Sequence, residues 1–94
     1  MQYANIHFVY HLILSKQADK TLRKLPRDLS RRIKEKLIQI AENPYAQHNN
    51  VTKLRERPGY RLRVGDWRII YEVENEKLII FVLKVGPRGE VYDE

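Results

Sequence analysis

Two alternating segments joined by a two-residue turn constrain the fold of this 94-residue chain more than any other feature. Residues 60–64 read Tyr-Arg-Leu-Arg-Val and residues 67–73 read Trp-Arg-Ile-Ile-Tyr-Glu-Val, with Gly65-Asp66 between them. Alternation of apolar and polar side chains is typical of a strand with one covered face, and a two-residue turn with glycine joins strands into a β-hairpin. The sequence therefore predicts a hairpin in which Val64 pairs with Trp67.

The register of this hairpin sorts its side chains onto two faces, because directly opposed residues point to the same side of a sheet. Arg61, Arg63 and Arg68 fall together on one face. The other face takes the apolar side chains, namely Tyr60, Leu62, Val64, Trp67, Ile69, Tyr71 and Val73. One carboxylate expected beside the arginines, that of Glu72, does not balance three guanidinium groups. Because a guanidinium binds phosphate oxygens in pairs, the arginines predict a preorganised site for a polyanion.

Two more strands are predicted, one near each end of the chain. Residues 10–14 read as a short strand from their β-branched and apolar content. Residues 78–83 follow a turn at residues 74–77 and are almost wholly apolar, as expected of an internal strand covered on both faces. Together with the hairpin, this last strand completes a three-strand antiparallel meander.

Two amphipathic helices are predicted between the first strand and the hairpin. Ser15 is the expected N-cap of the first helix, and Pro26 ends it. The second helix runs from about Asp28 to Glu42, with its apolar side chains on one face. The expected fold is α+β with two layers, in which one N-terminal strand and the meander form a sheet and both helices pack on one of its faces.

Composition narrows the classes of function. The chain has 18 Lys and Arg against 12 Asp and Glu, a net charge of +6 that favours a polyanion or an acidic partner. It has no cysteine, which excludes disulfides and thiolate metal sites and fits a reducing cytoplasm. No apolar run approaches the roughly 18 residues of a membrane helix. No metal-ligand cluster or glycine-rich phosphate loop is visible. We expect a cytoplasmic protein that uses no metal and no cofactor.

From Tyr10 to Tyr92 the chain resembles the RelE/ParE superfamily, the toxins of type II toxin–antitoxin systems. The segments that carry the resemblance are Lys53-Leu54-Arg55, residues 59–73, Val85-Gly-Pro-Arg88 and Val91-Tyr92. They occur in the family's order and span nearly the whole chain. The resemblance implies a single RelE/ParE-like domain over residues 1–94, in which residues 1–9 form an N-terminal extension.

The resemblance implies a toxin that a cognate antitoxin neutralises. Its RelE-like branch implies an mRNA interferase, an endoribonuclease that enters the ribosome, cuts mRNA there and so inhibits translation. In such members the 2′-hydroxyl attacks the adjacent phosphate. Basic residues of the hairpin, an arginine after the last strand and a C-terminal tyrosine serve this reaction. Here these positions fall on Arg61, Arg63, Arg68, Arg88 and Tyr92. Other basic residues expected to bind RNA are Lys53, Arg55, Arg57, Arg23 and Lys24.

The resemblance also implies roles for these residues. We expect Arg68 and Arg61 to bind the scissile phosphate and stabilise its pentacovalent charge. Arg88 is expected to stabilise or protonate the leaving 5′-oxygen. Tyr92 is expected to stack on an unpaired base, as aromatic side chains do with single-stranded RNA.

The general base stays open. Well-studied RelE members carry lysines where this chain has Arg61 and Arg63. A lysine can give up its proton and act as a base, whereas a guanidinium stays protonated. Either Tyr92 or a ribosomal group takes the proton of the 2′-hydroxyl, or the rate of cleavage is low, or the chain does not cleave RNA. His48 is the imidazole to test as a base.

Two other functions remain open at this point. ParE-type relatives share the fold and poison DNA gyrase, and the missing lysines keep that activity in play. A basic RNA-binding module without catalysis would show salt-sensitive binding and no cut product. For the toxin, the expected antitoxin is acidic or amphipathic and covers the open basic face or displaces the C-terminal segment.

Overall fold

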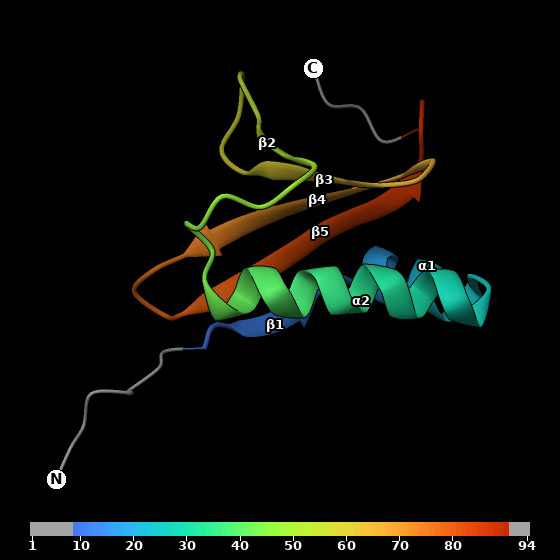
Figure 1. Cartoon of the computed structure of the whole chain (residues 1–94), viewed down its shortest axis with the longest axis horizontal. Helices are drawn as coiled ribbons and strands as arrows, with labels where there is room; N and C mark the ends of the chain where they lie inside the picture. The colour runs from blue at the N-terminus through green and yellow to red at the C-terminus, as the bar shows by residue number, and fades with distance from the viewer. Residues whose placement is uncertain (1–8, 91–94) are drawn as a thin grey trace, which may run out of the picture.

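A computed structural model of the chain describes residues 9–90. Within that range the chain forms five strands and two helices (Figure 1). In chain order, the elements are β1 (His11–Leu14), α1 (Lys16–Lys24), α2 (Arg27–Glu42), β2 (Val51–Lys53), β3 (Tyr60–Val64), β4 (Trp67–Glu74) and β5 (Ile79–Pro87). Neither helix in this part of the chain is long and apolar enough to cross a membrane.

The strands form one mixed sheet in the order β1-β5-β4-β3-β2. β3, β4 and β5 make the predicted antiparallel meander, and β1 lies parallel to β5. Both helices cover the same face of the sheet (Figure 1). The predicted two-layer α+β fold is therefore confirmed, with one strand more than predicted. β2 is missing from the prediction because a strand of three residues is too short to show alternation.

The hydrophobic core lies between the helices and the covered face of the sheet. Its side chains are at most 4% exposed, and they are Ala18, Leu22, Ile33, Leu37, Ile40, Ala41, Leu62, Val64, Ile69, Tyr71, Ile80, Val82 and Val85. On β3 and β4 these core residues occupy the alternate positions that the sequence predicts. Each buried aliphatic side chain contributes about 1.5–3 kcal/mol, which fixes this face of the sheet toward the helices and leaves the other face open.

Helix α1 begins where β1 would otherwise continue along β5. The Ser15 Oγ accepts a hydrogen bond from the Ala18 N–H at 3.0 Å, which confirms the predicted N-cap, and its hydroxyl donates to the Leu83 carbonyl at 2.7 Å. Gln17 then binds both backbone groups of Val85, accepting from its N–H at 3.0 Å and donating to its carbonyl at 2.8 Å. The side chains of Ser15 and Gln17 thus provide hydrogen-bond partners for backbone groups of β5 beyond its last pairing with β1.

Strand β5 differs from its prediction in length and in covering. It continues to Pro87, beyond the predicted end at Leu83, and its pairing with β4 shifts between Ile70 and Tyr71. The prediction that both of its faces are covered is wrong, because Phe81 and Leu83 are only half-buried on the face that the helices leave open. On that face Leu83 packs against Leu54 and Ile70 in a small second cluster. The almost continuous apolar run therefore reflects the internal place of β5 in the sheet and this local packing, and not a full second layer.

Tyr71 is the largest buried side chain of residues 9–90, and its ring stacks on Tyr60 with centroids 5.4 Å apart. Burial raises the pKa of the Tyr71 hydroxyl far above its ordinary value of 10.0, and the neighbouring Tyr60 raises it further. The unfolded chain thus loses this proton at lower pH than the folded chain. The contribution to stability is complete below about pH 10 and is lost as the pH rises above that value.

We therefore expect the free energy of unfolding to fall between about pH 10 and pH 11, by up to about 1.4 kcal/mol per pH unit for this one group. In Tyr71→Phe, which keeps the ring stack and removes the hydroxyl, the fall should be shallower. Urea denaturation of both proteins at several alkaline pH values measures the two slopes. Equal slopes would show that the hydroxyl of Tyr71 does not cause the alkaline loss.

Candidate nucleic-acid interface and active site

The open face of the sheet, which neither helix covers, carries the arginines of the hairpin. β3 and β4 pair in the predicted register, which places Arg63 directly opposite Arg68. Arg61 lies two residues earlier on β3, opposite Ile70, and so on the same face. Gly65 begins the turn with a φ of +56°, a backbone conformation that favours glycine. The two-residue turn thus fixes the register that gathers the three arginines.

Arg88 reaches the same corner of the sheet from the end of β5. Its backbone N–H donates to the carbonyl of Asp66 in the β3–β4 turn at 2.6 Å, and the preceding Pro87 pairs with Trp67. The turn and the end of β5 lie at the same end of the sheet, at the right of Figure 1. Residues more than twenty positions apart in the sequence therefore meet here.

The positive charges of Arg61, Arg63, Arg68 and Arg88 are close enough to affect one another. Partial burial lowers the pKa of the Arg68 guanidinium below its ordinary value, and three positive neighbours lower it further. In decreasing order of effect these neighbours are Arg63, Arg88 and Arg61, while Asp66 acts in the opposite direction. Arg68 is thus the centre of a cluster of like charges, which we call the arginine corner. Such a cluster is relieved when an anion binds to it.

Neutral oxygens hold the two facing arginines. Arg68 Nη1 donates to the Gly65 carbonyl at 2.9 Å and to the Trp67 carbonyl at 3.0 Å. Arg63 Nη2 donates to the side-chain oxygen of Asn50 at 2.9 Å. A carbonyl or amide oxygen orients a guanidinium without cancelling its charge, as a carboxylate would. Both side chains are thereby ordered while their charge remains available to a phosphate.

Two residues of the open face are missing from the predicted site. Lys84 is exposed and lies opposite Ile70, whose partner on the other side is Arg61. The predicted strand ended at Leu83, so the sequence assigned Lys84 to no face of the sheet. Asn50 contacts Arg63 through the end of β2, and the sequence offers no signal for it because that strand was not predicted.

Comparisons with known proteins show the family of this chain. Residues 12–92 match the family model of the ParE toxin of type II toxin–antitoxin systems. The mRNA interferase toxin RelE of Escherichia coli K12 is 33% identical over 87 residues, which cover 90% of this chain and 92% of that protein. The chain belongs to the RelE/ParE toxin family. The membership that the sequence indicates is confirmed.

Solved structures of RelE/ParE toxins share the fold. The archaeal RelE–RelB complex from Pyrococcus horikoshii OT3 matches with a TM-score of 0.74 and 33% identity, over 88% of this chain and 99% of that chain. The intact E. coli RelBE toxin–antitoxin complex matches with a TM-score of 0.72 and 33% identity, over 83% of this chain and 95% of that chain. Both were solved with their antitoxin.

Three of the other predicted RNA-binding residues of this RelE/ParE toxin lie on the helix side of the sheet, and two lie in the loop whose Leu54 packs on Ile70 of the open face. Lys53 on β2 pairs with a residue of the helix-covered face, so its side chain belongs to that side. Arg23 and Lys24 lie in the last turn of α1, across the sheet from the corner. Arg55 and Arg57 are exposed in the loop between β2 and β3. Tyr92, the predicted base-stacking residue, lies outside the described residues.

His48 also lies on the helix side of the sheet. Its Nε2 is 2.7 Å from the Asn43 carbonyl, and the hollow beside it is lined by Gln39 of α2 and by Leu62 of the covered face. The sheet therefore stands between this imidazole and the arginine corner, and His48 as the general base is wrong on geometry. Within residues 9–90, no group of three or more His, Asp or Glu residues is placed to hold a metal ion.

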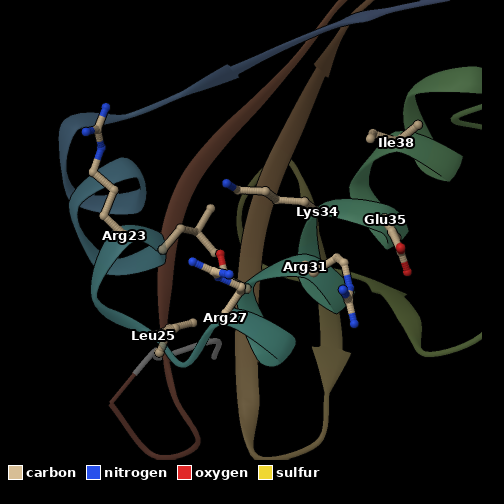
Figure 2. Close-up of a pocket in the computed structure, with 9 residues that line it drawn as sticks. Arg23, Leu25, Arg27, Arg31, Lys34, Glu35 and Ile38 are labelled. Atoms are coloured by element: carbon tan, nitrogen blue, oxygen red, sulfur yellow. The ribbon is translucent and has the colours of Figure 1, made fainter.

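The toxin has a second basic surface, a groove of about 530 Å³ between α1 and α2. Its lining comprises Leu22, Arg23, Leu25, Arg27, Ser30, Arg31, Lys34, Glu35 and Ile38. Figure 2 shows Lys34 of α2 extending toward α1 across this groove. Some of the helix cations are neutralised locally, since Arg23 pairs with Asp19 at 3.2 Å and Arg31 pairs with Asp28 at 3.3 Å. The groove and the arginine corner lie on opposite sides of the sheet.

Proposed function

We propose that this protein is the toxin of a type II toxin–antitoxin pair and acts in the cytoplasm as a ribosome-dependent mRNA endoribonuclease. The observation that carries the proposal is the arginine corner, where two strands of a rigid hairpin and the end of β5 bring four guanidinium groups together. The name of the E. coli relative, an mRNA interferase toxin, supports the same activity here.

The corner suits the charge that develops on a phosphate. In the proposed reaction the 2′-hydroxyl attacks the adjacent phosphorus, the bond from phosphorus to the 5′-oxygen breaks, and that oxygen takes up a proton. Negative charge grows on the non-bridging oxygens in the transition state, where fixed guanidinium donors stabilise it most. Arg68 and Arg61 bind the scissile phosphate, Arg63 adds charge beside them, and Arg88 stabilises the leaving oxygen.

Arg68 serves this reaction as a charge and not as a base. Although its neighbours lower its pKa, a guanidinium stays protonated at neutral pH. The proton of the 2′-hydroxyl then passes to Tyr92 or to a group of the ribosome. Tyr92 also stacks on a base of the bound mRNA.

A cognate antitoxin is the expected partner besides the ribosome and mRNA. The RelE–RelB complexes of P. horikoshii and E. coli support this partner. An acidic or amphipathic segment laid over the open face would occupy the arginine corner and exclude phosphate from it. Neutralisation and RNA binding then compete for the same charges.

Mapping mRNA ends after expression tests the proposal. The chain is induced in cells that carry a reporter message and a copy of that message without its start codon. We expect growth arrest and in-frame cuts in the translated copy alone. Intact mRNA together with gyrase-linked DNA breaks would instead assign the chain to the gyrase-poisoning activity of ParE toxins. RNA binding without cuts or toxicity would instead indicate an RNA-binding module without catalysis.

A further inference from the structure

Asn50 makes two hydrogen bonds to Arg63. The backbone N–H of Arg63 donates to the Asn50 carbonyl at 2.9 Å, and Arg63 Nη2 donates to Asn50 Oδ1 at 2.9 Å. Asn50 precedes β2 and lies opposite Arg63, which itself lies opposite Arg68 on the next strand. Like charges directly opposite one another repel. The amide therefore holds the Arg63 guanidinium toward β2, while Arg68 binds the carbonyls of the turn.

The backbone of Asn50 adopts a conformation that few residue types accept. Its φ is +68°, and among the non-glycine residues of the described chain only Asn50 and Leu78 have a positive φ. This conformation costs most side chains about 1–2 kcal/mol, whereas glycine adopts it freely. Asparagine and glycine both accept this conformation, so Asn50→Gly can remove the amide without straining the backbone.

What the amide adds is orientation without neutralisation. A guanidinium has five N–H donors, and the bond to Asn50 uses one nitrogen, which leaves donors for two phosphate oxygens. An exposed arginine otherwise samples many rotamers, and ordering it when RNA binds would cost up to about 2 kcal/mol. Here the side chain is ordered before the ligand arrives, and its full charge is kept.

We propose that Asn50 is a positioning residue for Arg63, whose side-chain amide aims the guanidinium at the phosphate of bound RNA while leaving its charge intact. The inference rests on the proposed function of the arginine corner as an RNA-cleaving site. It adds to that site a neutral residue from the turn before β2, a strand that carries none of the predicted catalytic arginines.

Four variants separate the positioning of Arg63 by Asn50 from effects on the fold and from effects of charge. Asn50→Gly tolerates the positive φ and removes the amide, whereas Asn50→Asp keeps an acceptor there and adds a negative charge. Arg63→Ala removes the positioned group. Asn49→Gly places a glycine in the same loop without removing the bond to Arg63, and it is the matched control. Thermal melting of each variant checks that the fold is kept.

Cleavage of a translated message is the first readout. We expect Asn50→Gly to lower the cleavage rate at saturating message about tenfold, because a misplaced charge loses transition-state stabilisation. In the Arg63→Ala background the same change should have no further effect, and Asn49→Gly should cleave like the wild-type chain. An equal loss from Asn50→Gly in both backgrounds would overturn the inference, since it would indicate a structural role alone.

Binding of a single-stranded RNA oligonucleotide at several salt concentrations is the second readout, and it does not require cleavage. Asn50→Asp and Arg63→Ala should each reduce the slope of log K against log[salt] by about 0.7, the loss of one phosphate contact. Asn50→Gly should leave the slope unchanged, because the charge remains. A full slope in Asn50→Asp would overturn the inference. A wild-type chain that shows this pattern but cuts no mRNA would refute the proposed cleavage and leave the inference standing.

Discussion

An Arg68→Ala variant is expected to lose at least about 100-fold of the mRNA-cleaving activity, the usual cost of removing one preorganised donor at a developing oxyanion. Arg68 stands at the centre of the arginine corner, with Arg63 across the hairpin and Arg88 beyond β5. Its two bonds to backbone carbonyls hold it in place before RNA binds. The measurement is the rate at which cut ends appear in a translated message, together with growth after induction.

Removal of a positive charge elsewhere controls for net charge. Arg31→Ala changes the charge of the protein equally, but Arg31 lies on α2 and pairs there with Asp28 at 3.3 Å. We expect this variant to cleave and to arrest growth like the wild-type chain. Arg68→Lys, which keeps a charge and loses the planar fork, should fall between the two. Equal losses of cleavage rate in Arg31→Ala and Arg68→Ala would show that the net charge of the protein, and not the position of Arg68, supports cleavage.

The arginine face could be predicted because a two-residue turn leaves no freedom of register. Once Gly65 and Asp66 form the turn, every side chain of the hairpin is assigned to a face by counting. Arg61, Arg63 and Arg68 were placed together on this ground alone, and the observed pairing agrees. The two helices could be predicted equally well, because helix caps and the spacing of apolar residues are local sequence signals.

The positions of Arg88, Asn50 and Lys84 could not be predicted from local sequence patterns. The approach of Arg88 depends on the length of β5, whose residues 84–87 pair with β4 beyond the predicted end of the strand. The contact between Asn50 and Arg63 depends on a strand of three residues. Lys84 falls after the shift in pairing between β4 and β5, so its face cannot be counted from the start of the strand. Long-range pairing decides all three positions.

Charge was a poor guide to position on this chain. Basic residues are dense along both helices, yet the structure places Arg23 and Lys24 on the opposite side of the sheet from the arginine corner. Lys53 also lies away from the arginine corner, because the pairing of β2 with β3 places its side chain on the covered side of the sheet. A strand pattern assigns a charge to a face, whereas a net charge does not.

Gly59→Ala is expected to destabilise the fold by about 3 kcal/mol or more, which lowers the melting temperature by about 15 °C for a domain of this size. Gly59 has a φ of +116°, and a Cβ there would lie 2.8 Å from the Tyr71 carbonyl oxygen and 3.2 Å from Glu72 Cγ. The Tyr71 carbonyl belongs to β4, an internal strand that is paired on both sides and cannot give way cheaply. The Gly59 carbonyl also accepts the Leu54 N–H at 3.0 Å, which closes the loop before β3.

Gly65→Ala is the milder comparison, with a φ in the left-handed region and no close contact. Gly65 also has a positive φ, +56°, but a Cβ there meets nothing within 4 Å, so we expect a loss of only about 1 kcal/mol. Thermal and urea unfolding of both variants measure the difference. Equal losses would mean that neither the φ of +116° nor the approach of Gly59 to β4 costs more than an ordinary left-handed turn. A larger loss at Gly59 would mean that this conformation and the contact with the β4 backbone together constrain the residue before β3.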